Sequence, residues 1–335
     1  MTDIDRASVE VAPVAGGAVD DASSIAGQGL AAKPLSPRRL AWNRFRRHKL
    51  AMVGMATLLV IVVLCVFAPL FTKHGPFFQY RFSYPDGPII RFIHPGHGHW
   101  FGGDHAGYDQ WTRVLYGGRI SLAVGFSVAF FSTVIGTIVG VIAGHYGGWV
   151  DNVMMRITDL FLAVPLLVLL IIGTQLPARH PWIATLMGQT HSMRAVITLL
   201  TLFFWMPTAR VVRGLCLSLK EKEFIEAARA SGASGPRIMA LHLVPNCVGQ
   251  IIVSATLAVA AAILIESVLS FLGFGVDAVH SVTWGSILNG AQGATDFAPY
   301  LTWFPGLAIV LTVLSVNFVG DGLRDALDPK QIRVG

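Results

Sequence analysis

Residues 94–105 hold the densest group of side chains able to bind a metal. The segment contains Asp104 and four histidines, His94, His97, His99 and His105. Imidazole and carboxylate groups are common ligands of divalent transition metals. Glycine and proline separate these histidines, and no two of them have the i, i+4 spacing that places ligands on one helix face. We expect a solvated loop with no bound metal, and keep the four histidines only as weak metal candidates.

Common catalytic motifs are absent from the sequence. It contains no GxxxxGK[ST] phosphate-binding loop, no HExxH zinc motif and no GxSxG nucleophile motif. We therefore predict no catalytic residues and no ATP hydrolysis by this chain.

A charged segment of helix-forming residues, 218–245, lies between two of the most apolar parts of the chain. Ser218 and Glu221 have the spacing of a helix capping box, and Gly232 is a typical residue at a helix C-terminus. A second short helix is expected from Ser234, with Pro236 in its first turn and Pro245 at its end. The segment predicts a hinged elbow of two helices.

The first of these helices carries Glu226, Ala227, Ala228 and Arg229. The side chains of the two alanines are short, so another protein can approach closely beside the carboxylate. An amphipathic helix lying on anionic lipid would show similar spacing, and the pattern alone does not separate the two.

The composition indicates a membrane protein. Hydrophobic residues make up 53% of the 335 residues and charged residues 13%, and the mean hydropathy is +0.61. A helix needs about 20 apolar residues to cross about 30 Å of hydrocarbon. Such runs, counting one shorter run flanked by arginines, predict six transmembrane helices at 51–72, 120–150 (ending near Gly144), 160–178, 195–209, 243–265 and 297–320.

Basic residues predict the orientation, because cytoplasmic flanks are enriched in Lys and Arg. With the N-terminus inside, 18 of the 25 basic residues are cytoplasmic. The other seven are Lys73, Arg81, Arg91, Arg113, Arg119, Arg179 and Arg194. Both termini are then cytoplasmic, and the net charge of +6 reflects membrane topology and contact with lipid. No basic domain with interleaved aromatic residues indicates nucleic-acid binding.

The expected organisation has five parts. Residues 1–37 form a disordered cytoplasmic tail, 38–72 a basic segment with the first span, and 73–118 an external loop that holds a short helix at 108–116. Residues 119–329 form a core domain with five spans, and 330–335 a second cytoplasmic tail.

Glu266 is the best candidate for a residue of a transport pathway or gate, since charge at mid-membrane is costly and usually functional. A buried hydrogen bond between helices and simple exposure near the outer interface are the alternatives.

The segment with Glu226, Ala227, Ala228 and Gly232, followed by His242, Pro245 and Asn246, resembles the EAA coupling loop of ABC importer permeases. Other parts of the chain resemble the dipeptide, oligopeptide and nickel branch of that family, namely LYGGRISLAVG at 115–125, HYGGWVDNVMMRITDLFLAVP at 145–165, SFLGFG at 270–275, SVTWGSIL at 281–288 and FPGLAIVLTVLSVNFVGDGLRDALDP at 304–329.

The resemblance implies an all-helical type I ABC importer permease in a bacterial inner membrane. Its partners would be a homologous permease subunit, two ATP-binding subunits that hold ATP and Mg, and an external substrate-binding protein. Glu226, Ala227, Ala228, Arg229 and Gly232 would form the elbow that couples to the ATPases. This chain itself would bind no cofactor.

Two departures from the family pattern concern the external side. The segment FGGDHAGYD at 101–109 has Gly103 and Tyr108 where the family has Thr and Arg, and the connection 174–193 is long. Peptide is the expected substrate, with nickel or another small solute as the alternative. A secondary transporter or a membrane scaffold would be a different class of protein, although charges that gather in one loop rather than at mid-membrane argue against the former.

Overall fold

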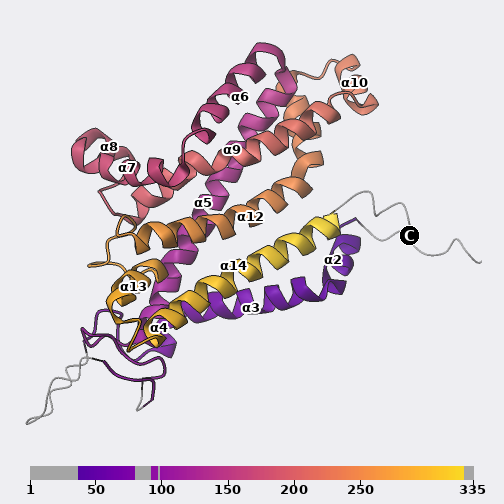
Figure 1. Ribbon diagram of the computed structural model, residues 1–335. Coiled ribbons are helices and arrows are strands. Elements are labelled where there is room, and N and C mark those ends of the chain that lie inside the picture. Colours follow the sequence, from indigo (N-terminus) through magenta and orange to yellow (C-terminus); the bar gives the residue numbers. More distant parts are fainter. Residues whose placement is uncertain (1–36, 80–91, 97–98, 328–335) are drawn as a thin grey trace, which may run out of the picture. The chain divides into compact units, whose positions relative to one another are not determined.

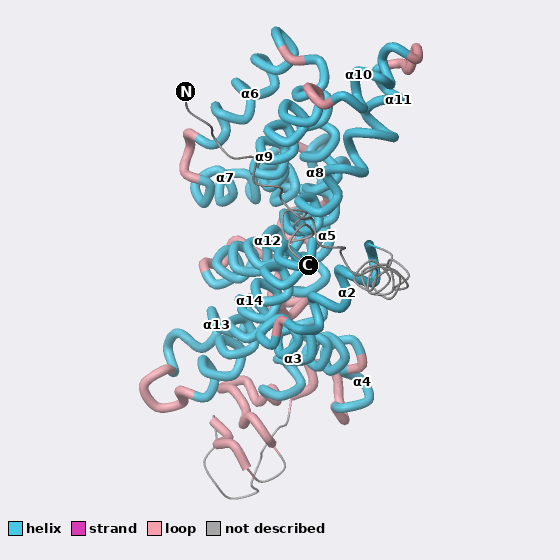
Figure 2. Tube along the Cα trace, turned by 90° about the vertical axis from the view of Figure 1, so that its right-hand side faces the viewer, coloured by secondary structure: helices cyan, strands magenta, loops and turns pink. Residues whose placement is uncertain are grey.

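The computed structural model describes residues 37–79, 92–96 and 99–327. The tail predicted at 330–335 and all but one residue of that at 1–37 lie outside this part of the chain. The described residues contain helices and four isolated β-bridges but no strand (Figure 2). The described residues from Ala41 onward form one packed unit.

The basic segment and the first predicted span form three helices. They are α2 (Pro37–Arg47), α3 (Lys49–Val66) and α4 (Ala68–Phe71). A break at Phe67 separates α3 from α4 and lies near the C-terminal end of the predicted span 51–72.

The second span is longer than predicted. α5 (Gln110–Tyr146) has 37 residues, and its N-cap Asp109 accepts a hydrogen bond from the Thr112 N–H. The prediction of a separate short helix at 108–116 is therefore wrong, because residues 110–116 are the first two turns of α5. Gly147 and Gly148, both with positive φ, make the tight turn expected after the span.

The third predicted span, 160–178, is not one straight helix. α6 (Gly148–Leu162) and α7 (Leu166–Arg179) meet at an angle of 90° across residues 163–165. Pro165 has no N–H to continue α6 and disfavours a helical conformation at the residue before it, which explains the break. A short helix, α8 (Pro181–Met187), follows α7.

Three long helices complete the membrane part: α9 (Met193–Leu219), α12 (Val244–Phe271) and α14 (Tyr300–Leu327). A further helix, α13 (Trp284–Ala291), lies between α12 and α14 in the chain. Five described helices are long and apolar enough to span a membrane, and the bent pair makes six if counted as one span. Figure 1 shows α3 beside α14, and these two helices are in contact.

Glycine allows α5 and α9 to pack closely. A Cβ atom on Gly136, Gly140 or Gly144 would lie 2.5–2.6 Å from atoms of α9, so no side chain fits at these three positions. Small residues spaced four apart are typical of close helix contacts in membranes. This contact fixes α9, from which the charged segment begins.

Candidate functional site

Two short helices, α10 (Glu223–Ala230) and α11 (Gly235–Ile238), lie between α9 and α12. One π-helical turn (Met239–Leu243) then joins α11 directly to α12. We call residues 220–243 the elbow. In Figure 1, α10 lies beyond the ends of α9 and α12, at the end of the bundle opposite α4 and α13.

α10 ends in a Schellman motif. The N–H of Gly232 donates to the carbonyl of Arg229 at 2.9 Å, and the N–H of Ala233 donates to the carbonyl of Ala228 at 3.0 Å. Gly232 has a φ of +80°, a conformation that residues with a Cβ rarely adopt. The predicted end of the first helix at Gly232 is confirmed.

The predicted capping box at the start of this helix is wrong. α9 continues through Leu219, so Ser218 lies in its last turn and donates to the carbonyl of Leu215 at 2.9 Å. The N-cap of α10 is Lys222, which has no side-chain capping bond. The capping-box pattern favoured a helix start at Ser218, but the packing of α9 keeps this residue inside α9.

Pro245 does not end the second helix. It lies in the first turn of α12, and the helix widens into the π turn just before it. The side-chain amide of Asn246 donates to the carbonyl of His242 at 2.6 Å within this junction. The second arm of the elbow is therefore continuous with a membrane helix, which gives it a rigid connection to the bundle.

One face of the elbow is buried against the membrane helices. Ile225 is 0% exposed and belongs to a cluster with Ile238 and Leu243 of the elbow. The same cluster includes Val141 of α5, Val212 and Cys216 of α9, and Cys247 of α12. The elbow is thus fixed to three long helices at once.

The opposite face is charged and open. Glu226, Ala227 and Arg229 are exposed, and Ala228 is half-buried. Neither Glu226 nor Arg229 forms an ion pair within the described ranges 37–79, 92–96 and 99–327. Their charges are therefore free to pair with another molecule.

Glu266 lies in a buried network of hydrogen bonds. The residue is 0% exposed; its carboxylate accepts a hydrogen bond from Ser121 Oγ of α5 at 3.0 Å and one from Ser270 Oγ at 2.7 Å. The N–H of Trp284, the first residue of α13, donates to the same Ser121 oxygen at 3.3 Å. Glu266 thus connects α12 to α5 and, through Ser121, to α13. A role in a gate stays a prediction.

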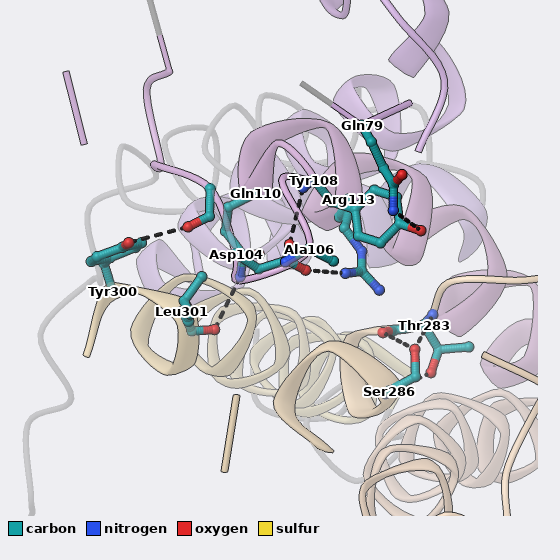
Figure 3. A network of polar contacts seen from close by, with 11 residues as sticks. Gln79, Asp104, Ala106, Tyr108, Gln110, Arg113, Thr283, Ser286, Tyr300 and Leu301 are labelled. Atoms are coloured by element: carbon teal, nitrogen blue, oxygen red, sulfur yellow. Dashed lines mark hydrogen bonds and ion pairs between the residues drawn. The ribbon is translucent and has the colours of Figure 1, made fainter. Parts of the chain in front are cut away.

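The described part of segment 73–118 is held by a polar network around Asp104 (Figure 3). The Asp104 carboxylate accepts hydrogen bonds from the N–H groups of Ala106 and Tyr108, each at 3.0 Å, and pairs with Arg113 of α5. The Tyr300 hydroxyl of α14 donates to the Gly103 carbonyl at 3.2 Å. The FGGD segment therefore connects the beginnings of α5 and α14.

The weak metal candidates do not converge in the structure. His99 Nδ1 lies 2.8 Å from a carboxylate oxygen of Asp109, while the rings of His94 and His105 lie against Tyr300 and Phe92. Within the described residues, no group of three or more His, Cys, Asp and Glu side chains is arranged for a metal. His97 lies outside them.

Two ion pairs between α6 and α9 escaped the sequence analysis. Asp151 pairs with Arg213, and Asp159 pairs with Arg210. The partners are 62 and 51 residues apart, so no local pattern connects them. Asp151 lies in the first turn of α6 and Asp159 in its last turn, so the two pairs tie both ends of α6 to α9.

Comparison with known families identifies the protein class. Residues 136–333 match the family described as "Binding-protein-dependent transport system inner membrane component". The chain belongs to this family. Residues 36–86 of the permease also match the "N-terminal TM domain of oligopeptide transport permease C". The resemblance seen in the elbow is confirmed.

The permease has relatives with similar sequences over most of their length. It is 38% identical over 297 residues to the "Dipeptide transport system permease protein DppC" of Alkalihalophilus pseudofirmus, covering 88% of this chain and 91% of that one. It is 37% identical over 300 residues to the "Oligopeptide transport system permease protein OppC" of Bacillus subtilis, covering 89% and 91%. It is 38% identical over 291 residues to the "Glutathione transport system permease protein GsiD" of Escherichia coli, covering 86% and 89%.

A solved structure shares the fold. The match is a chain from "Inward facing conformations of the MetNI methionine ABC transporter", with a TM-score of 0.51 and 24% identity over 64% of this chain and 96% of that one. The permease therefore has the all-helical fold of an ABC importer permease. It is a multi-pass inner-membrane subunit that works with other ABC subunits, and its family is one of transporter permeases rather than enzymes.

Proposed function

We propose that the permease imports peptides that an external binding protein delivers, driven by ATPases that contact its elbow. It would form the pathway with a homologous permease subunit, and two partner subunits would bind and hydrolyse ATP with Mg. The relatives named for dipeptides, oligopeptides and glutathione, itself a small peptide, support the substrate class.

The exposed face of α10 is the observation that carries the coupling role. Neither Glu226 nor Arg229 forms an ion pair with a described residue, whereas Ile225 of the same helix is fully buried. A helix fixed on one side and charged on the other can transmit force from a partner into the bundle. Placing this face in the cytoplasm agrees with the distribution of basic residues and puts both termini there.

Uptake of labelled trialanine by cells that carry or lack the permease tests the substrate class. Uptake that depends on the permease supports peptide import, whereas permease-dependent uptake of nickel without uptake of trialanine would contradict it.

Charge reversal tests the elbow. Glu226→Lys is expected to lower trialanine uptake at least tenfold, the equivalent of about 1.4 kcal/mol of lost contact, with unchanged amounts of permease in the membrane. Glu221→Lys is the matched control, because Glu221 is also exposed but lies before α10. Equal uptake in the two variants would refute the assignment of this face.

A further inference from the structure

The break between α6 and α7 places irregular backbone at membrane depth. The apolar run that predicts the third span, 160–178, begins in the last turn of α6 and continues through most of α7. Residues 163–165, where the chain turns by 90°, lie inside this predicted span.

Backbone groups at this break lack partners. The N–H groups of Val164, Leu166 and Leu167 donate to no acceptor within the described residues, and the carbonyls of residues 160–164 accept from no donor there. Such groups cost several kcal/mol each in hydrocarbon. Irregular backbone at this depth is found where it is covered by protein or lines a water-filled cavity.

The break faces a cavity of about 630 Å³. Its walls include residues 161–166 of the break, Phe203, Pro207 and Thr208 of α9, and Gln250 and Ser254 of α12. Most of the lining residues are apolar, and the polar groups at the cavity are the unpaired backbone of the break, Thr208 of α9, and Gln250 and Ser254 of α12.

A proline in α9 removes the usual helical donor from a backbone carbonyl of a residue that lines the same cavity. Pro207 has no N–H, so the carbonyl of Phe203, four residues earlier, loses its helical donor, and no described side chain replaces it. In α14, by contrast, Pro305 frees the carbonyl of Leu301, and the Gln110 side chain donates to that carbonyl at 3.0 Å. A side chain therefore pairs the freed carbonyl in α14, whereas none of the described side chains donates to the one in α9.

Charged residues lie one turn away from the cavity. Asp159 precedes the lining residues Leu162 and Ala163 by three and four positions, and Arg210 follows Pro207 by three. Their paired side chains are 52% and 45% exposed. An ion pair this exposed does not face lipid tails at low cost, so this side of α6 and α9 faces water or a polar molecule.

These groups identify the occupant by chemistry. An acyl chain has no hydrogen bonds to offer, and the backbone of a packed partner helix is already paired internally. A peptide in extended conformation offers one donor and one acceptor per residue, which matches a wall with both unpaired N–H and unpaired C=O groups. We propose that this cavity is a hydrated part of the pathway whose walls pair with the main chain of the transported peptide. This inference rests on the proposed import of peptides.

Cysteine accessibility in the assembled transporter tests the inference. The three native cysteines are buried and give little background. Val164→Cys and Ser254→Cys are expected to react with a membrane-impermeant, positively charged thiosulfonate at least tenfold faster than Leu59→Cys, a control on the outer face of α3 that is 62% exposed. Saturating trialanine, supplied with binding protein and ATP, is expected to slow both reactions at least threefold.

Uptake of trialanine by the same vesicles separates the two hypotheses. If uptake is normal but both cavity cysteines react as slowly as Leu59→Cys, or react fast without protection by trialanine, the inference is wrong and peptide import stands. If the native transporter takes up no trialanine, the proposal of peptide import is wrong, and so is the assignment of a peptide to this cavity.

Restoring the missing N–H gives an independent measurement. Pro207→Ala lets residue 207 pair with the Phe203 carbonyl, so KM for trialanine uptake is expected to rise about fivefold, as for the loss of one hydrogen bond. Pro305→Ala is the matched control and is expected to leave KM unchanged, because Gln110 already pairs the carbonyl it frees. Equal KM values in the two variants would overturn the role of the open carbonyl.

Discussion

Replacing Gly232 with alanine isolates the backbone energy of the elbow. A Cβ built on Gly232 meets nothing within 4 Å, so the substitution causes no steric clash. The φ of +80° nevertheless penalises any residue with a Cβ by about 1–2 kcal/mol. This energy should lower the population of the closed Schellman motif about 5- to 30-fold relative to open forms.

Hydrogen exchange measures this population directly. The N–H of Ala233 is protected by its bond to the Ala228 carbonyl, and that bond exists only while Gly232 keeps its conformation. In Gly232→Ala we expect exchange at residue 233 to accelerate about 5- to 30-fold. ATP-driven uptake should fall as well, because the face that carries Glu226 loses its fixed orientation.

Gly214→Ala is the matched control for this experiment. A Cβ on Gly214 also meets nothing within 4 Å, but the residue lies inside α9 and its φ is not positive. Alanine there should stabilise the helix by about 0.5–1 kcal/mol and leave uptake unchanged. If Gly232→Ala exchanges and transports like Gly214→Ala, the elbow does not depend on the left-handed turn.

Three further predictions concern other parts of the chain. Gly140→Ala should lower the free energy of unfolding by about 1–3 kcal/mol, because its Cβ would lie 2.6 Å from a backbone carbonyl of α9. A lower Tm in detergent would show this loss. Gly306→Ala should not lower the Tm, because the space around Gly306 is open. Glu266→Leu should lower the Tm more than Glu266→Gln. Leucine leaves the buried hydroxyl donors of Ser121 and Ser270 unpaired, at about 1–3 kcal/mol each, whereas glutamine can still bond to them. A larger loss of Tm in Glu266→Gln would contradict the role of Glu266 in this hydrogen-bond network. The hydrogen bond from His280 lowers the pKa of Asp277. The turn around Asp277 should therefore keep its stability above the usual carboxyl pKa of about 3.9 and lose it as the pH falls below that value. Amide exchange, corrected for its intrinsic rate, should show this loss, and Asp277→Asn should remove the pH dependence.

Hydropathy predicted where the membrane helices lie but not how they bend. An apolar run reports the cost of leaving a segment in water, and that cost is the same whether the helix is straight or broken. The run at 160–178 therefore gave a correct membrane segment and a wrong shape, although Pro165 was a local signal for the break. Likewise, Asp109 is a recognisable N-cap, yet the polar residues that follow it concealed the continuity of α5.

The elbow, the cavity and Glu266 also differ in how far the sequence could predict them. Gly232 was predictable because one residue's backbone conformation ends a helix, and that requirement is local. The cavity was not predictable, since its walls come from three segments about 40 residues apart in sequence: 161–166, 203–211 and 250–261. Likewise, Glu266 was recognisable as a buried charge, but its serine partner in α5 lies 145 residues away.

The elbow and the cavity share two helices. α9 forms a cavity wall up to Val211 and ends eight residues later, about 12 Å along the axis, where the elbow begins. α12 leaves the elbow at Val244 and reaches the cavity at Gln250, about 9 Å away. Because both helices are continuous over these distances, a tilt of the elbow moves both walls together.

The third wall responds differently to such a tilt. α6 is tied to α9 by its two ion pairs and should follow it, whereas α7 is separated from α6 by the non-helical residues 163–165, where the N–H of Val164 and the carbonyls of residues 163 and 164 have no described partner. Motion driven at the elbow would therefore be taken up at the break, where the fewest backbone hydrogen bonds resist it. If the proposed peptide contact holds, the same unpaired groups would also make the break the place where the cavity changes its width.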